Sequence, residues 1–477
     1  MKKLGENIIY LLLNSISISI IGFIFWFLLL KFIAPEDYGT VSYIYSTSIL
    51  LLGFFSFGIF WSIWKYCSEN QFYKVSFFSI ILSLLMISMI FLVSQILLKN
   101  IYIFIFAFAM FLSSYFENIL FGYQEIKKIF IANFLSSILK IVFLLILVSL
   151  YKSLSIEVAI LIATSQLFIA SILKLYFSKR IILENFKLEI DFKNIKRFFY
   201  LAFSNFISSF SSSFFPNILV ISSFWIFSSI IAGVMFFSQL ISATISFLVA
   251  PIVNASLPII SNLAYKKRDE DAKRIIQTLF RISLVISITL IFPITFHLKT
   301  ILEFLNLKQE FINYSPTFFL VISISSLFFL ISGILYSFLF SINKIKEIYL
   351  IEIFCILLFI TLLIFISLNS NVLLFLLSYL FISFLRFFLY SLSLKSLFKS
   401  APEKFNIKLS FLILFSFFIS YILTSKIFLI DISLLILSFI LIIFIIKKIK
   451  IFEKKEKTFI QKLNLPEFMK KIIFKLI

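Results

Sequence analysis

Most of this sequence consists of apolar stretches long enough to cross a lipid bilayer, separated by short polar gaps, from residue 8 to residue 447. A helix of about 20 mostly apolar residues spans the hydrocarbon core of a bilayer. With 62% hydrophobic and 14% charged residues, the chain is far less charged than soluble globular proteins, in which about 25% of residues are charged. The sequence therefore predicts an all-α polytopic membrane protein.

The polar gaps between these stretches define a topology. We predict fourteen transmembrane helices, at 8–33, 40–64, 75–98, 101–122, 129–150, 156–177, 196–223, 227–261, 276–298, 314–341, 346–368, 371–395, 408–425 and 428–447. Of the 43 Lys and Arg, 35 then lie on the side of the N-terminus, 6 lie on the other side, and Lys140 and Arg386 lie within spans. Because cytoplasmic loops carry an excess of Lys and Arg, both termini are predicted to be cytoplasmic. The net charge of +21 is thus a topology signal that suits an anionic inner leaflet, and it does not indicate nucleic-acid binding.

A tight outer turn separates the first two spans. It reads Lys-Phe-Ile-Ala-Pro-Glu-Asp-Tyr-Gly from Lys31 to Gly39. Pro35 cannot extend the first helix, the acidic pair that follows it requires water, and Gly39 is expected to relax the backbone. The second span then closes on Gly58, two tryptophans and Lys65.

This turn, followed by a glycine-bearing helix that ends on a cation, resembles the start of the Wzx-type lipid-linked oligosaccharide flippases of the multidrug/oligosaccharidyl-lipid/polysaccharide exporter superfamily. The resemblance extends as a layout over roughly residues 5–400. It implies a flippase that moves polyprenyl-pyrophosphate-linked oligosaccharide from the inner to the outer leaflet of the cell membrane by alternating access of two lobes. Its ligands would be that lipid-linked oligosaccharide and membrane lipids, and glycosyltransferases or a polymerase of the same pathway are candidate partners. We expect a monomer that needs no cofactor and is not an enzyme.

An internal repeat supports two lobes. A shift of 194 residues aligns serines of the first span with serines of the seventh, Gly22 with Pro216, and Gly39 with Gly233. An even number of helices per repeat gives a parallel pseudo-two-fold arrangement. We therefore predict a six-helix lobe at 1–178, a cytoplasmic linker at 179–196, a second six-helix lobe at 197–400, two extra membrane helices at 401–447 and a basic amphipathic cytoplasmic tail at 448–477.

Motifs for catalysis are missing from the sequence. It has no GxSxG, no nucleotide-binding glycine loop, no HExxH and no CxxC, and its two cysteines and one histidine predict neither a disulfide framework nor a metal site. The outer acids are scattered over separate short turns, and only Glu36 and Asp37 are adjacent. This pattern favours translocation over catalysis.

Two cations are predicted deep within spans. Lys140 is roughly 16 Å from either end of its helix at 1.5 Å per residue, which places it near the midplane, and Arg386 lies nearer the inside. A cation at such depth costs about 2.5–3.5 kcal/mol and needs a partner or a wet cavity. We expect both to give the cleft between the lobes a positive field for a pyrophosphate, together with three cations near its mouths, Lys31, Lys65 and Arg281.

Ion pairing within a lobe is the alternative for these cations. Glu117 could pair with Lys140 or serve in coupling, although their depths differ by about 9 Å. Glu352 lies near an inner helix end, where we expect water to solvate it. His297, near the outer end of its span, is expected to be interfacial.

Uncharged side chains complete the predicted cleft. Trp26 is the tryptophan deepest in a span and could stack on sugars. Four amide side chains could bind sugar hydroxyls or, alternatively, pack between helices; they are Asn14, Asn205, Gln239 and Asn254. Moving one bare hydroxyl into hydrocarbon costs about 4–8 kcal/mol, so a glycan needs such a polar path.

Three other functions remain open. A cation-coupled multidrug exporter would have the same fold but usually has a buried acid in its first lobe, and the first two spans here have none. A membrane glycosyltransferase or polysaccharide polymerase would need a sizeable outer loop, whereas no outer gap exceeds about 16 residues. A structural partner in a cell-envelope assembly is the third.

Overall fold

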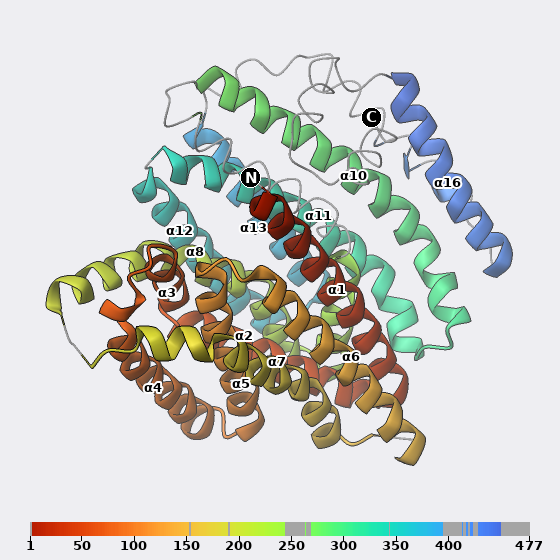
Figure 1. Ribbon diagram of the computed structural model, residues 1–477. Helices are drawn as coiled ribbons and strands as arrows, with labels where there is room; N and C mark the ends of the chain where they lie inside the picture. The colour runs from red at the N-terminus through yellow and green to blue at the C-terminus, as the bar shows by residue number, and fades with distance from the viewer. Residues whose placement is uncertain are drawn as a thin grey trace. The chain divides into compact units, whose positions relative to one another are not determined.

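The computed structural model describes residues 2–151, 154–188, 191–243, 269–342, 344–394 and 428–449, with isolated positions at 263, 413, 416–417 and 420–422. Every regular element in these ranges is helical (Figure 1). Eleven of the described helices are long and apolar enough to cross a membrane. The prediction of an all-α polytopic membrane protein is confirmed.

The chain divides into two compact units, Met1–Phe236 and Phe237–Ile477. The first contains α1 (Lys2–Phe32), α2 (Pro35–Phe55), α3 (Ile59–Ser68), η1 (Phe72–Lys74), α4 (Ser76–Leu92), η2 (Val93–Leu97), α5 (Ile101–Gly122), α6 (Ile126–Tyr151), α7 (Ile156–Asn185) and α8 (Phe192–Ile226). A shorter apolar helix, Ser229–Ala243, begins in this unit. The second unit contains α10 (Asp269–Phe304), α11 (Gln309–Ser341), α12 (Ile345–Asn369), α13 (Val372–Ser393) and α16 (Phe428–Ile449).

Packing within each unit follows a few long helix pairs. In the first unit, α1 packs on α6, α6 on α7, α5 on α7, and α2 and α3 pack along α8. In the second, α11 packs on α10 and α13, α12 packs on α13, and α16 packs on α10. Unit 1 thus holds α8 in addition to the six spans before it, and the lobe boundaries at 178 and 197 stay a prediction. Residues 395–412 and 450–477, and with them most of the predicted extra span at 408–425 and the tail, lie outside the described residues.

The turn between the first two spans is shorter than predicted. Pro35 is the first residue of α2, where a missing N–H costs nothing, and Ala34 before it is extended. Glu36 and Asp37 lie in the first turn of α2, where carboxylates are favoured by the helix dipole. The acidic pair therefore starts the second span instead of preceding it.

The predicted second span is two helices. Phe57 has a φ of 43° and Gly58 a φ of 75°, so the chain turns between α2 and α3. A Cβ at Gly58 would lie 2.2 Å from the Ala202 carbonyl oxygen of α8. Glycine is needed here both for the left-handed backbone and for the approach of α8.

Gly39 has a different role from the one predicted. It is helical, and it allows close contact with helix Ser229–Ala243, where Gly233 lies against the Gly39 backbone. A Cβ at Gly39 would lie 1.7 Å from the Ser229 carbonyl oxygen. The two glycines that the internal repeat aligns are thus neighbours in space.

The close contact at Gly39 predicts how adding one methyl group there changes the stability of the protein. Gly39→Ala should destabilise the protein by about 1–3 kcal/mol, because the obstructing atom is backbone and cannot rotate away. The matched control is Gly22→Ala on α1, where a Cβ meets nothing within 4 Å and the substitution should be neutral or stabilising. Thermal unfolding in detergent measures both, and equal midpoints for the two variants would contradict the close approach.

Candidate functional site

One face of α6 is polar and buried. Four polar residues of α6 are each at most 7% exposed: Asn133, Ser136, Ser137 and Lys140. Successive members are three, one and three residues apart. Residues at this spacing share one side of a helix, while Leu139 and Phe143 on other sides are exposed. This face, which we call the α6 polar face, is the candidate site.

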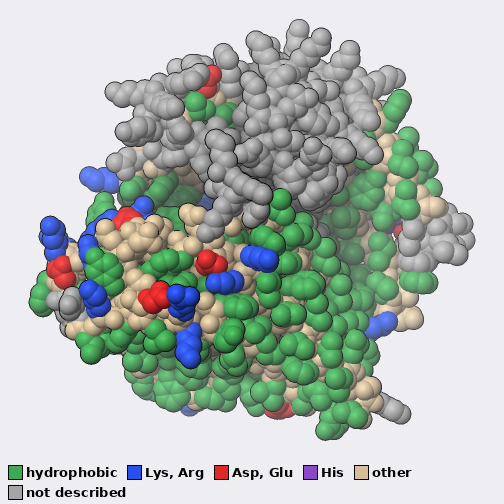
Figure 2. Space-filling model, viewed as in Figure 1, with side chains coloured by type: hydrophobic (Ala, Val, Ile, Leu, Met, Phe, Trp, Pro, Cys, Tyr) green, Lys and Arg blue, Asp and Glu red, His purple; other side chains and the backbone are tan. Residues whose placement is uncertain are grey.

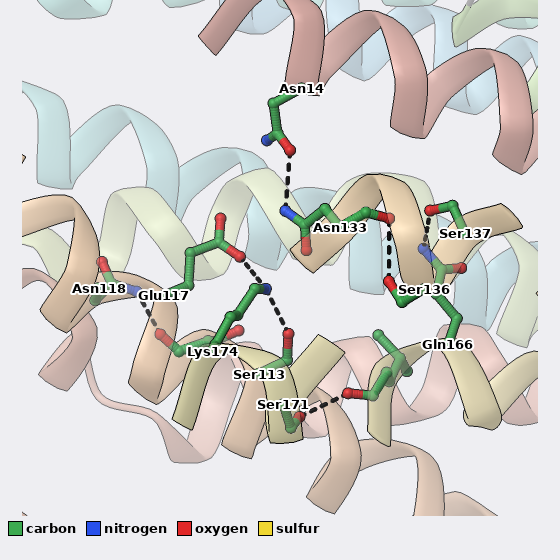
Figure 3. Close-up of polar contacts among 12 residues, drawn as sticks. Asn14, Ser113, Glu117, Asn118, Asn133, Ser136, Ser137, Gln166, Ser171 and Lys174 are labelled. Atoms are coloured by element: carbon green, nitrogen blue, oxygen red, sulfur yellow. Dashed lines mark hydrogen bonds and ion pairs between the residues drawn. The ribbon is translucent and has the colours of Figure 1, made fainter. Parts of the chain in front are cut away.

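Side chains from two neighbouring helices meet the α6 polar face (Figure 3). Asn133 Nδ2 donates a hydrogen bond to Asn14 Oδ1 of α1 over 3.0 Å. Gln166 Nε2 of α7 donates to the Ser137 hydroxyl over 2.7 Å. The predicted cleft residue Asn14 therefore lies beside Asn133. The sequence analysis missed Gln166, although a polar side chain within an apolar span is a signal that could have identified it.

Lys140 is the charged member of this face. Its side chain is 5% exposed, and its Nζ lies 4.2 Å from the centre of the Phe25 ring on α1. No carboxylate lies within ion-pair distance of it among the described residues. A cation–π contact is worth about 2 kcal/mol when desolvated, less than the cost of about 2.5–3.5 kcal/mol for a cation at the bilayer centre. The ammonium thus lacks a full counter-charge.

Glu117 pairs with a lysine other than Lys140. Lys174 of α7 contacts both the Glu117 carboxylate and the Ser113 hydroxyl of α5, the latter at 2.7 Å (Figure 3). The pairing of Glu117 with Lys140 that we weighed is wrong in this structure. Because Lys174 is fully buried and its charge is matched, this pair adds no net charge to the lobe.

Arg386 of α13 is neutralised inside its own unit. Its Nε lies 3.0 Å and its terminal nitrogen 2.6 Å from Glu352 Oε1 of α12. Glu352 is fully buried and also accepts a hydrogen bond from Tyr390, so the prediction that water solvates it is wrong. The guanidinium also lies 5.1 Å from the Phe329 ring centre. A paired guanidinium supplies little of the positive field expected of it.

Trp26 is buried in an aromatic cluster. It is 5% exposed, and its ring contacts those of Tyr38, Tyr45 and Phe236 at centroid distances of 6.1, 5.2 and 4.7 Å. In this conformation its ring is packed against protein and is closed to a sugar.

The other predicted residues are dispersed. Lys31 is exposed at the end of α1, and Lys65 is partly exposed and 3.7 Å from Glu69. Arg281 is buried on α10, Asn205 and Gln239 are partly buried, and Asn254 lies outside the described residues.

Basic residues gather where α3, α7 and α8 end or begin (left of Figure 2). Arg197 of α8 contacts both carboxylate oxygens of Glu69 at 2.8 Å, which ties α8 to α3. Hydrophobic side chains cover much of the remaining described surface in this view. The exposed cations of this end are Lys179, Arg180, Lys187, Lys193, Lys196 and Arg197.

Comparison with known proteins identifies first the fold class of this chain and then its family. The fold is that of a membrane transporter of the MOP superfamily. It is similar to a lipid II flippase, MurJ, in an inward closed conformation (TM-score 0.63, 16% identity, 90% of this chain and 98% of that one). It is also similar to a multidrug resistance MATE family transporter in an inward-facing conformation (TM-score 0.60, 15% identity, 83% of this chain and 96% of that one). A third similar structure is a MOP superfamily transporter from Pyrococcus furiosus (TM-score 0.51, 13% identity, 83% of this chain and 94% of that one).

The family model of polysaccharide biosynthesis proteins matches residues 4–264, more than half of the chain, and the MatE model matches residues 201–366. The chain belongs to the polysaccharide biosynthesis protein family. A search of curated proteins finds no match. The polysaccharide biosynthesis family in which the sequence resemblance placed the chain is thereby confirmed, and the chain is a multi-pass membrane protein whose fold is that of MOP superfamily transporters.

Proposed function

We propose that the protein is a flippase that moves polyprenyl-pyrophosphate-linked oligosaccharide from the inner to the outer leaflet of the cell membrane. The observation that carries this proposal is Lys140, a buried ammonium whose contacts are those of one aromatic ring and not of a carboxylate. A pyrophosphate would provide the missing counter-charge. The lipid tail would remain in the bilayer while the headgroup passes the α6 polar face.

The α6 polar face also suits the sugar part of such a ligand. Asn14, Asn133 and Gln166 bond to one another or to serine, so each can exchange a neutral protein partner for a sugar hydroxyl at little cost. Several serines of α1 and α8 instead donate to carbonyls of their own helix, as Ser17 does to Leu13 at 2.6 Å and Ser212 does to Ser209 at 2.8 Å. We therefore assign hydroxyl recognition to the amides.

The charge distribution supports the orientation required. The basic ends of α3, α7 and α8 would face the cytoplasm, together with both chain termini, where anionic lipid headgroups attract them. We propose alternating access of the two predicted lobes as the mechanism and a monomer as the working unit. Glycosyltransferases or a polymerase would supply or consume the glycan.

A cation-coupled exporter of the same fold is the second candidate, favoured by the MatE match over residues 201–366. Against it, the buried polar groups of the described part of unit 1 include no carboxylate, and Glu117 of α5, which is partly exposed, is matched by Lys174. A buried cation without a counter-charge favours an anionic substrate.

Binding to the purified protein tests the assignment of Lys140. We expect a polyprenyl pyrophosphate to bind at least about tenfold tighter than the corresponding polyprenol, because an ionised hydrogen bond contributes about 1.5–3 kcal/mol. Lys140→Met should remove that difference and leave polyprenol binding unchanged. Equal affinities of the wild-type protein for both lipids would contradict the proposal.

A further inference from the structure

Two cations of unit 1 share one aromatic ring at the end where α3, α7 and α8 end or begin. Lys74 of η1 and Lys187, which follows α7, lie with Nζ 5.8 Å and 4.8 Å from the centre of the Tyr73 ring. Lys74 also donates a hydrogen bond to Gln71 Oε1 over 3.4 Å, which is a neutral acceptor. No carboxylate lies within ion-pair distance of either lysine in the described part of the chain. Two like charges therefore meet at one ring without a counter-charge.

Other charged groups at this end are matched. Arg197 of α8 contacts both carboxylate oxygens of Glu69 at 2.8 Å, and Arg180 of α7 contacts Glu184 at 2.7 Å. Asp191 caps the first turn of α8. These acids are engaged by other groups, so the two lysines on the shared ring stand apart from their neighbours.

The backbone around Lys187 fixes its position. Its N–H donates to the hydroxyl of Ser76, which is the first residue of α4 and is 1% exposed, over 3.2 Å. The Phe186 ring before it contacts the Phe77 ring at a centroid distance of 6.4 Å. The chain that leaves α7 is therefore folded back on the start of α4, directly after η1.

Apolar side chains beside Lys187 are exposed. Leu188 is 72% exposed, and Phe192 at the start of α8 is 82% exposed. Hydrophobic and basic side chains adjoin each other over this end of unit 1 (left of Figure 2). Because α4 is a candidate membrane span, the two lysines lie where a span meets the membrane surface. A soluble anion would leave Leu188 in water, whereas a phospholipid has a phosphate next to its acyl chains and matches both groups.

The chemistry of the ring site favours a phospholipid over the lipid-linked glycan. A glycan needs hydrogen-bonding amides as well as cations, and the amide beside this ring, Gln71, is engaged by Lys74. The ammonium groups can turn from the ring to a phosphate, because a cation–π contact at an exposed site is weaker than a charge-assisted hydrogen bond.

We propose that Lys74 and Lys187 bind the phosphate of an anionic phospholipid, with Leu188 among its acyl chains. A phosphate that contacts both lysines joins η1 to the chain after α7, so the lipid fastens this linker to the start of α4. General attraction between basic loops and an anionic leaflet requires no particular residue, whereas this site depends on two. The inference does not depend on the transported substrate.

Lipid binding to the purified full-length protein tests the site. Native mass spectrometry in detergent measures the binding of phosphatidylglycerol and of phosphatidylcholine, in which the choline cation offsets the charge of the phosphate. We expect the wild-type protein to bind phosphatidylglycerol at least about tenfold tighter. Replacing both lysines by methionine, Lys74→Met with Lys187→Met, should remove most of that preference. Equal affinities of the wild-type protein for the two lipids would overturn the proposal.

A matched control separates the site from diffuse attraction. Lys179 of α7 and Lys196 of α8 are exposed lysines of the same end. Lys179→Met with Lys196→Met changes the net charge by the same amount and should retain the preference for phosphatidylglycerol. Equal losses in the two double variants would mean that the basic end acts as a whole, and the site would be refuted.

Hydrogen exchange measures the fastening of the linker in the wild-type protein itself. The backbone N–H of Lys187 should exchange about tenfold more slowly in nanodiscs that contain phosphatidylglycerol than in nanodiscs of phosphatidylcholine alone. Exchange that is the same in both lipids would contradict the fastening. Polyprenyl pyrophosphate serves as the competing ligand. If it bound more tightly than phosphatidylglycerol and lost its binding in Lys74→Met with Lys187→Met, the site would belong to the transported lipid and the proposal would fail.

Discussion

Lys140→Met is expected to slow translocation of a lipid-linked oligosaccharide by about 10- to 100-fold. A charge-assisted contact is worth about 1.5–3 kcal/mol, and each 1.4 kcal/mol is a factor of ten. Methionine is unbranched and one atom shorter than lysine, and it can pack on the Phe25 ring that Lys140 Nζ contacts, so the loss reports the charge. The rate is measured in proteoliposomes that contain equal amounts of folded protein.

Two comparisons make this result specific. Lys127→Met removes the same charge from an exposed position at the start of α6 and should leave the rate nearly unchanged. Lys140→Met should also unfold no more easily than the wild-type protein, because it removes a buried cation that costs about 2.5–3.5 kcal/mol. Wild-type rates in Lys140→Met would exclude Lys140 from the transport path.

Glu352→Gln is expected to lower the free energy of unfolding by about 3–5 kcal/mol, because it leaves the Arg386 guanidinium buried without its counter-charge. Arg386→Gln should have a loss of the same order, since it leaves Glu352, which is fully buried, as an unmatched anion. The double variant should recover most of the loss, because both desolvation penalties disappear together. Unfolding in detergent measures the three variants.

The matched comparison for this pair is Lys299→Gln. Its ion pair with Glu303 spans 4.0 Å between exposed side chains, and exposed pairs contribute about 0–1 kcal/mol. A loss below about 1 kcal/mol in Glu352→Gln would mean that water reaches Arg386, and it would return this residue to the set of candidate substrate contacts.

Sequence reasoning found the buried cations but assigned their partners wrongly. The depth of Lys140 and that of Arg386 each follow from counting residues along the residue's own helix. Burial confirms both as interior residues. Which helices are neighbours is a tertiary property that one sequence does not state. A signal was nevertheless present, because Glu352 lies seven residues after the start of α12 and Arg386 seven before the end of α13, so antiparallel packing brings them to one depth.

Glycine positions illustrate the same limit. A local argument predicts a relaxed turn at Gly39, because this residue follows a proline and two acids. In the structure its missing side chain matters because another helix, which begins at Ser229, 190 residues further along the chain, passes within contact distance. The repeat that aligned Gly39 with Gly233 gave the better indication, since residues related by a two-fold axis often meet near that axis.

The buried contact of His297 with Asp431, 2.9 Å between Nδ1 and Oδ1, could not be predicted for a further reason. The sequence analysis placed His297 near the outer end of its span, where a polar residue needs no partner, and Phe428, the first residue of α16, lies 124 residues beyond Phe304, the last residue of α10. Only the packing of α16 on α10 makes the two side chains neighbours.

The central claim, flipping of a lipid-linked glycan, is tested most directly in proteoliposomes that contain the purified full-length protein and a fluorescent polyprenyl-pyrophosphate oligosaccharide. A membrane-impermeant quencher reports how fast the labelled headgroup reaches the opposite leaflet, and a fluorescent hydrophobic cation serves as the exporter substrate for comparison. We predict rapid exchange of the glycan lipid, its loss in Lys140→Met, and no transport of the cation. Exchange of the glycan lipid no faster than in protein-free liposomes, beside active transport of the cation, would contradict the account.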